Sequence, residues 1–206
     1  EAAPASTGTR GDLLAGLASL PAESLPGPSG ALTPNDDGTW TLSTREDAGQ
    51  MVVELPPELL SALFQPGVAN TLRRADAILE LVSYNQAAIS DGGVAFGLGA
   101  TNGLGQQTIG QVQLVDTDFV SLGLNLNGQF RSLTEFPLQE LRLAFSVRRT
   151  DTTTLSFYVN DRLLGDSVFL FPQGEPVTLL LFAAGRDVVV RVQSFVLDYS
   201  PRDEIP

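Results

Sequence analysis

From Gly38 onward the sequence consists of short apolar runs separated by turn residues, and this rhythm constrains the fold more than any other feature. In residues 120–127, Val and Leu alternate with Ser, Gly and Asn, and residues 141–148 alternate in the same way. Successive side chains of a strand point to opposite faces of the sheet. Such runs predict antiparallel strands with one face in a core and the other in solvent. We therefore expect an all-β fold in which two sheets pack together.

The strand candidates cover most of the chain after residue 38. They are "TWTLS", "MVVEL", "GVAFGLG", "IGQVQLV", "FVSLGLNLN", "LRLAFSVRR", "TLSFYVN", "PVTLLLF" and "DVVVRVQSFVLDY". Within residues 152–168 the pattern predicts a hairpin. Leu155, Phe157 and Val159 face the core, Asn160-Asp161 forms a two-residue turn, and the return strand begins at residues 163–164.

Two segments have a helical pattern instead. Residues 56–64, "PPELLSALF", place a proline at the start of an apolar face, which predicts one short helix. Residues 70–84 fit either a helix or a strand, because Leu72, Leu79 and Val82 have helical spacing whereas Leu79 and Leu81 flank Glu80 as in a strand. We expect a strand from about Asp76, since hairpins surround it.

The first 35 residues differ from the rest, with five prolines and five glycines among residues 1–34. This composition is typical of an arm or linker, so we expect an arm at 1–35 and a sandwich domain at 36–206. Within the arm, Asp12 can cap a short helix whose apolar side chains recur at helical spacing. These are Leu13, Leu14, Leu17 and Leu20. The helix either lies on its own domain or is offered to another copy in an assembly.

Charge and composition exclude several classes of function. The chain has 12 basic and 24 acidic residues, a net charge of −12 that repels nucleic acids and anionic lipids. No apolar stretch approaches the roughly 18 residues of a membrane span, so we expect no membrane insertion. Cys, His and Lys are all absent, which removes thiolates, disulfides and the usual general base. Glycoside hydrolysis by two carboxylates is the main reaction class left.

The order of segments resembles the concanavalin A-like lectin/glucanase jelly rolls, which include laminin-G-like domains. A strand like "LRLAFSVRRT" is followed by a hairpin like "TLSFYVNDRLL", and the end resembles "VQSFVLDYSP". The segments "DDGTW", "GGVAFGLGATNG" and "VSLGLNLNGQF" also fall where such domains place early strands and central hairpins. The resemblance covers roughly residues 36–200 and implies a two-sheet antiparallel jelly-roll sandwich.

The resemblance also bears on whether the protein is an enzyme. Retaining glucanases of this family carry two glutamates in an E-x-D-x-x-E run, and this sequence has none. The nearest pair, Asp76 and Glu80, would share a strand face about 13 Å apart, too far for either glycosidase geometry. We therefore predict that the protein is not an enzyme. Nor does the sequence contain the histidine of legume-type metal sites. Ca²⁺ is conceivable at "NDDGTW" or at Asp116–Asp118, but capped turns fit both better, so we predict no cofactor.

Several polar residues could make a binding surface. Gln111, Gln113, Asn125, Arg142 and Tyr158 are expected to project from one sheet as a shelf of amides, a guanidinium and a ring, suited to sugar hydroxyls; a solvated sheet face looks the same. Trp40 is expected in the core. We favour an extracellular or cell-surface recognition module for glycan or protein. The alternative is a structural subunit of a homo-oligomer or larger complex, held by the arm.

Overall fold

The computed structural model describes residues 8–28, 31–44, 49–65, 70–90, 93–137 and 141–201. The strands are β1 (Thr9–Asp12), β2 (Leu32–Pro34), β3 (Trp40–Ser43), β4 (Gln50–Leu55), β5 (Asn70–Ser83), β6 (Ala95–Thr101), β7 (Gln107–Leu114), β8 (Phe119–Leu126), β9 (Gln129–Pro137), β10 (Arg142–Arg149), β11 (Leu155–Val159), β12 (Arg162–Asp166), β13 (Thr178–Ala184) and β14 (Val189–Pro201). The helices are α1 (Leu13–Ala18), α2 (Pro57–Phe64) and α3 (Ala87–Ser90), with a 3₁₀ turn at Ala22–Ser24.

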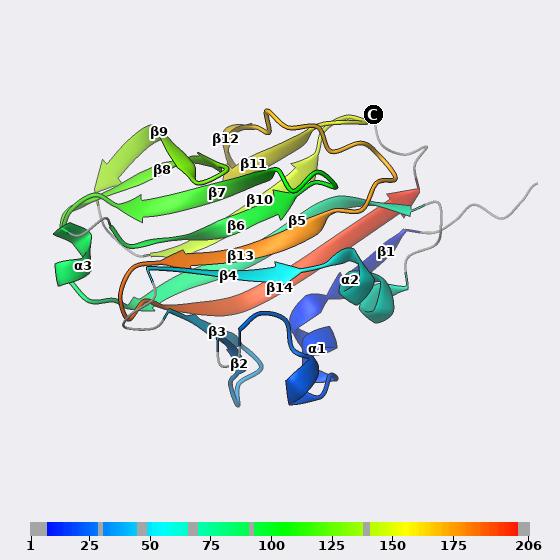
Figure 1. Ribbon diagram of the computed structural model, residues 1–206, viewed down its shortest axis with the longest axis horizontal. Helices are drawn as coiled ribbons and strands as arrows, with labels where there is room; N and C mark the ends of the chain where they lie inside the picture. Colours follow the sequence, from blue (N-terminus) through cyan, green and yellow to red (C-terminus); the bar gives the residue numbers. More distant parts are fainter. Residues whose placement is uncertain are drawn as a thin grey trace, which may run out of the picture.

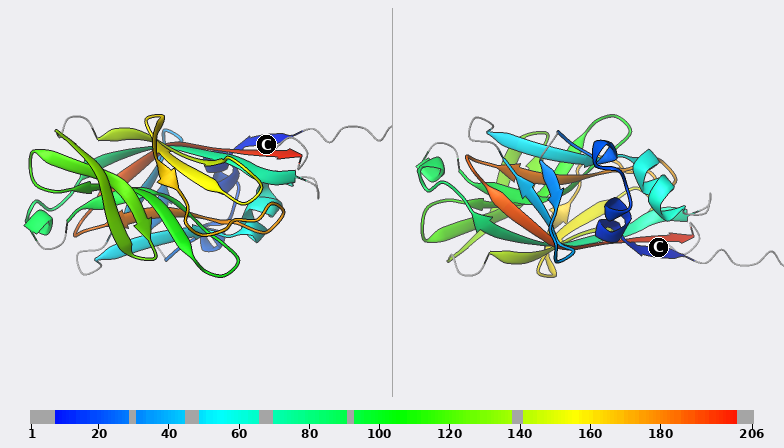
Figure 2. Two further views of the ribbon diagram at one scale, coloured as in Figure 1. Left: turned by 90° about the horizontal axis from the view of Figure 1, so that it is seen from above. Right: turned by 90° about the horizontal axis from the view of Figure 1, so that it is seen from below.

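Two antiparallel sheets form the sandwich, as expected (Figure 1). The eight-stranded sheet has the order β12-β11-β10-β5-β14-β3-β2, and β1 pairs with the far half of β14. The six-stranded sheet has the order β4-β13-β6-β7-β8-β9. Figure 2 shows the two sheets and their twist from above and below. The helices α1 and α2 lie together at one end of the sandwich, and α3 lies at the other (Figure 1).

The core lies between the sheets and is built from the inward side chains that alternation predicts. Trp40 and Phe157 are fully buried, and the rings of Phe96 and Phe145 meet edge to face across the core at 5.8 Å. The hairpin β11–β12 is confirmed: Asn160 and Asp161 have φ of 49° and 60°, the left-handed values that a tight two-residue turn requires.

The N-terminal segment is not a separate arm, which corrects our expectation for residues 1–35. Residues 1–7 and 29–30 lie outside the described residues, but from Thr9 the chain adds β1 to the sheet, and β2 follows at its edge. Asp12 caps α1, its Oδ1 accepting from the backbone N–H of Leu14 at 2.9 Å.

The leucines assigned to an assembly arm serve the protein's own core. Leu13, Leu14 and Leu17 are buried in the main core cluster, and Leu20 packs against it. Phe64 of α2 covers β1 so closely that a Cβ at Gly11 would lie 2.2 Å from its ring. Helix α1 therefore lies on its own domain, and its buried leucines are not offered to a partner.

Two further strands differ from the sequence prediction. The ambiguous segment is strand β5, which starts at Asn70 rather than near Asp76, because β14 pairs with it along its whole length. Strand β9 had no counterpart among the predicted strands. It is a largely exposed edge strand, so its residues lack the apolar alternation that marks a strand in sequence. Helix α2 begins at Pro57, as predicted. None of the described helices has the length and apolar character needed to cross a membrane.

Candidate functional site

The structure divides the five residues of the predicted shelf between two opposite faces. Gln111, Gln113 and Asn125 lie on β7 and β8 and point outward from the six-stranded sheet. Arg142 and Tyr158 lie on β10 and β11 and point outward from the eight-stranded sheet. The prediction that these five residues form a single surface is therefore wrong. Alternation in the sequence assigns a residue to one face of its strand but does not tell which strands share a sheet.

The outer face of the six-stranded sheet is ordered in cross-strand rows. The central row runs Val52, Phe182, Gly97, Gln111, Gly123 and Ser132 from β4 to β9. One adjacent row runs Gln50, Ala184, Ala95, Gln113, Ser121 and Glu135. The other adjacent row runs Glu54, Leu180, Gly99, Ile109, Asn125 and Phe130. We call these three rows the six-strand face.

Many side chains of the six-strand face have little surface exposed to water. The strands that carry them nevertheless contact mainly one another and, across the core, the opposite sheet. Ser121 and Asn125, expected on a wet face, are 2% and 9% exposed. Glycines explain the close packing: a Cβ at Gly97 would lie 2.1 Å from the carbonyl oxygen of Gly110, and one at Gly123 would lie 2.0 Å from that of Arg131. The strands approach so closely on this side that only glycine fits there.

The polar half of the six-strand face holds paired amides and hydroxyls. Asn125 Nδ2 donates to Gln111 Oε1 at 2.9 Å, a buried bond between β8 and β7. The hydroxyls of Ser121 and Ser132 lie 2.6 Å apart across β8 and β9. Asn125 Oδ1 is buried and accepts no hydrogen bond from the residues that the structure describes. The ring of Phe130 lies over Gly123, with Cε2 3.0 Å from where a Cβ would be.

The other half is apolar. Ala95, Ile109, Leu180 and Phe182 form a second buried cluster, separate from the main core. These four residues, and Ser132 and Phe130, were not among the site residues predicted from the sequence. A signal for part of them exists in "VTLLLF", which is apolar at every position after Thr178. Such a run is typical of a strand buried on both faces.

The carboxylates of the six-strand face stand at its margins. Glu54 lies on β4 and Glu135 on β9, the two edge strands. Five strand spacings separate them, roughly 24 Å, which exceeds both glycosidase geometries. Nor do the residues described here include a group of three or more side chains suited to a metal ion.

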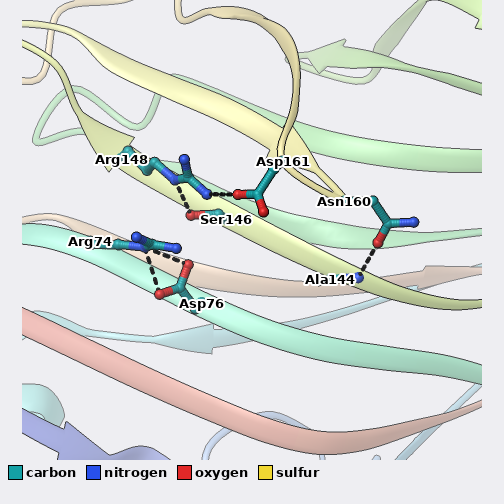
Figure 3. A network of polar contacts seen from close by, with 7 residues as sticks. All are labelled: Arg74, Asp76, Ala144, Ser146, Arg148, Asn160 and Asp161. Carbon is teal, nitrogen blue, oxygen red and sulfur yellow. Dashed lines mark hydrogen bonds and ion pairs between the residues drawn. The ribbon is translucent and has the colours of Figure 1, made fainter.

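The outer face of the eight-stranded sheet is charged. Gln193 donates to Glu80 Oε2 at 2.6 Å and accepts from Arg142 Nε. Asp76 and Glu80 both point outward from β5, as predicted. Arg148 lies over the ring of Tyr158, with Cζ 4.3 Å from the centroid, and pairs with Asp161 in the network of Figure 3.

The two segments considered for Ca²⁺ are capped turns. Asp37 Oδ1 accepts from the backbone N–H of Thr39 at 3.0 Å and from its hydroxyl, and these bonds lower the pKa of Asp37. Asp116 Oδ1 accepts from the N–H groups of Asp118 and Phe119 at 2.7 and 2.8 Å. Each of these carboxylates is thus engaged by its own turn.

Comparison with known proteins identifies the architecture. No protein-family model and no curated protein matches the sequence. Among solved structures, the κ-carrageenase of Pseudoalteromonas carrageenovora, in complex with an oligotetrasaccharide of κ-carrageenan, superposes with a TM-score of 0.52 at 11% identity, covering 97% of each chain. The Crh5 transglycosylase superposes with a TM-score of 0.52 at 12% identity, covering 96% of this chain and 88% of that one. The fold is the concanavalin A-like jelly roll.

This likeness corrects one prediction. The sequence led us to expect a protein that is not an enzyme, and that expectation is contradicted, because the solved structures that share this jelly roll over almost the whole chain include a carrageenase and a transglycosylase. At 11–12% identity the similarity concerns the fold. The prediction had rested on the missing E-x-D-x-x-E run and on the separation of Asp76 and Glu80.

Proposed function

We propose that the protein is a carbohydrate-active jelly roll that binds a glycan chain on the six-strand face. The observation that carries this proposal is the group of accessible side chains on β7 and β9 of the six-strand face, Gln113, Phe130 and Ser132, which surround the buried Gln111–Asn125 amide pair. Sugars present hydroxyl edges and apolar C–H faces, so a surface of amides and hydroxyls next to apolar side chains complements both.

The arrangement of the face supports an extended ligand. Polar residues predominate on β7, β8 and β9 and apolar residues on β13 and β6, and the glycines at 97, 99 and 123 remove side chains from the middle of the face. A chain of sugars laid across the strands would meet Phe130 and Ser132 on β9 and then Gln113 on β7. Two of the fold's solved neighbours act on polysaccharides or glycans by name, which supports the same ligand class.

The test is binding of the full chain to a panel of soluble polysaccharides, measured by affinity electrophoresis and titration calorimetry. Phe130→Ala and Gln113→Ala remove half-buried side chains from the six-strand face and should weaken binding about tenfold, the effect of losing one good contact. Tyr158→Ala, on the opposite face, is the matched control and should bind neutral polysaccharides normally.

The same samples are assayed for release of reducing ends, which reports any cleavage of the bound glycan. Retained affinity in both six-strand variants, or loss in Tyr158→Ala alone, would show that the ligand sits elsewhere. No binding across neutral and charged polysaccharides would contradict the proposal outright. We further propose an extracellular or cell-surface location, where such polysaccharides are met; fractionation of the source cells tests it.

A further inference from the structure

The opposite side of the molecule carries a second feature, a cluster of arginines on the outer face of the eight-stranded sheet. Cross-strand neighbours in one row are Arg10 on β1, Asp198 on β14, Arg74 on β5 and Arg148 on β10. A cavity of about 260 Å³ opens beside this row. Its charged and hydroxyl lining consists of Arg10, Arg74, Asp76, Ser146, Arg148, Asp161 and Ser194.

Arg148 is held in one orientation from three sides. Its Nε donates to Ser146 Oγ at 2.9 Å and its Nη2 donates to Asp161 (Figure 3). Its Cζ lies over the Tyr158 ring. Its Nη1 makes no hydrogen bond to the described residues. A guanidinium fixed in this way loses little conformational entropy when a ligand accepts its remaining N–H groups.

Arg74 and Arg10 add further donors. Arg74 engages Asp76 through Nε alone, at 2.8 Å to Oδ1 and 2.7 Å to Oδ2, so its two terminal nitrogens make no hydrogen bond within the described parts of the chain. Arg10 is exposed and has neither an ion pair nor a side-chain hydrogen bond there. The cavity is thus supplied with guanidinium donors that the described residues leave free.

The acids of the cavity are already engaged. Asp76 is paired with Arg74, and Asp161 with Arg148, whose hydrogen bond and charge lower the pKa of Asp161. Asp198 stands in the row between Arg10 and Arg74 but is not part of the lining. Three guanidiniums face two paired carboxylates, an excess of one positive charge at the cavity in a chain of net charge −12.

We propose that this cavity binds a single oxyanion group, a carboxylate or a sulfate. Guanidinium N–H groups form paired hydrogen bonds with the oxygens of such groups, and the free donors point to an acceptor ligand rather than to a cation. The charge of the surrounding surface repels a long polyanion, so one acidic substituent fits better than a nucleic acid. The two sources of this chemistry are a free inorganic anion and the acidic substituent of a sugar.

The test uses the full chain labelled with ¹⁵N-arginine and follows the arginine Nε–Hε signals. Sodium sulfate, sodium glucuronate and glucose 6-sulfate are titrated against sodium chloride at constant ionic strength, because chloride controls for screening. The proposal predicts saturable shifts of the Arg74 and Arg148 signals with at least one of the oxyanions. Saturation by sulfate alone identifies a free anion as the source, whereas tighter binding of either sugar acid identifies an acidic sugar.

Arg74→Gln and Arg10→Gln should each weaken binding about tenfold, since each removes a charge-assisted contact. Arg142→Gln is the matched control, an arginine of the same face that does not line the cavity, and its affinity should be unchanged. Thermal melting confirms that each variant is folded. Shifts that do not saturate, shifts that chloride reproduces, or equal weakening in Arg142→Gln would overturn the proposal.

Discussion

Replacing Leu17 with alanine measures whether the N-terminal helix belongs to the core. Leu17 is 1% exposed and belongs to the main core cluster with Leu13 and Leu14. Truncating a buried leucine costs about 2–5 kcal/mol through lost burial and the cavity left behind. In a chain of this size each kcal/mol lowers the melting temperature by about 2–4 °C. Leu17→Ala should therefore melt about 4–20 °C below the wild type.

The assay combines thermal and urea denaturation followed by circular dichroism with size-exclusion chromatography. Leu20→Ala is the control, because Leu20 packs on the core but is only half-buried, and its loss should be less than half as large. The elution volume should not change in either variant. An unchanged melting temperature together with a smaller assembly would refute the reasoning, since it would place Leu17 in a contact between molecules.

Three further predictions concern the sandwich itself. Phe157→Ala should lower the free energy of unfolding by about 3–5 kcal/mol, whereas Tyr158→Ala on the outer face should cost less than half of that; equal losses in urea titrations would contradict the strand register. Burial raises the pKa of Tyr199 to about 12. The contribution of this shift to the free energy of unfolding should therefore be fully present below pH 10, where the tyrosine of the unfolded chain begins to ionise. It should fall by about 2–3 kcal/mol as the pH rises to 12. Tyr199→Phe should flatten that decline, and an unaltered decline would assign it to other groups. Gly97→Ala should destabilise by about 1–3 kcal/mol, because its Cβ would lie 2.1 Å from a backbone carbonyl of β7, whereas Gly103→Ala, whose Cβ has only a side-chain atom at 3.9 Å, should be nearly neutral.

Local sequence patterns were sufficient to predict those elements whose own residues determine their structure. The β11–β12 hairpin is one, because alternating apolar residues and an Asn-Asp turn specify both the strands and the reversal. Helix α2 is another, marked by a proline at its start. Averaged composition failed for residues 9–12, where prolines and glycines nearby concealed a strand, whereas the helical spacing of Leu13, Leu14 and Leu17 did indicate the helix that follows.

The candidate site was predicted less well, because it depends on which strands become neighbours. The Gln111–Asn125 bond requires β7 beside β8 with a defined register, whereas Arg142 reached the opposite face because β10 pairs with β5. The six-strand face also depends on backbone approach at Gly97 and Gly123. A glycine in a strand signals such an approach, but its place on a shared face emerges only from strand order.

The pairing of β1 with β14 also governs the order of folding. Residues 9–12 meet residues 196–199, so the first described strand finds its partner only after almost the whole chain has been synthesised. Contacts of such long sequence separation slow folding, since a large loop must close before they form. Until then Leu13, Leu14 and Leu17 have no core to enter, and the nascent chain exposes an apolar segment. The sandwich is thus completed late in folding, when β1 and β14, at the two ends of the described chain, pair with each other.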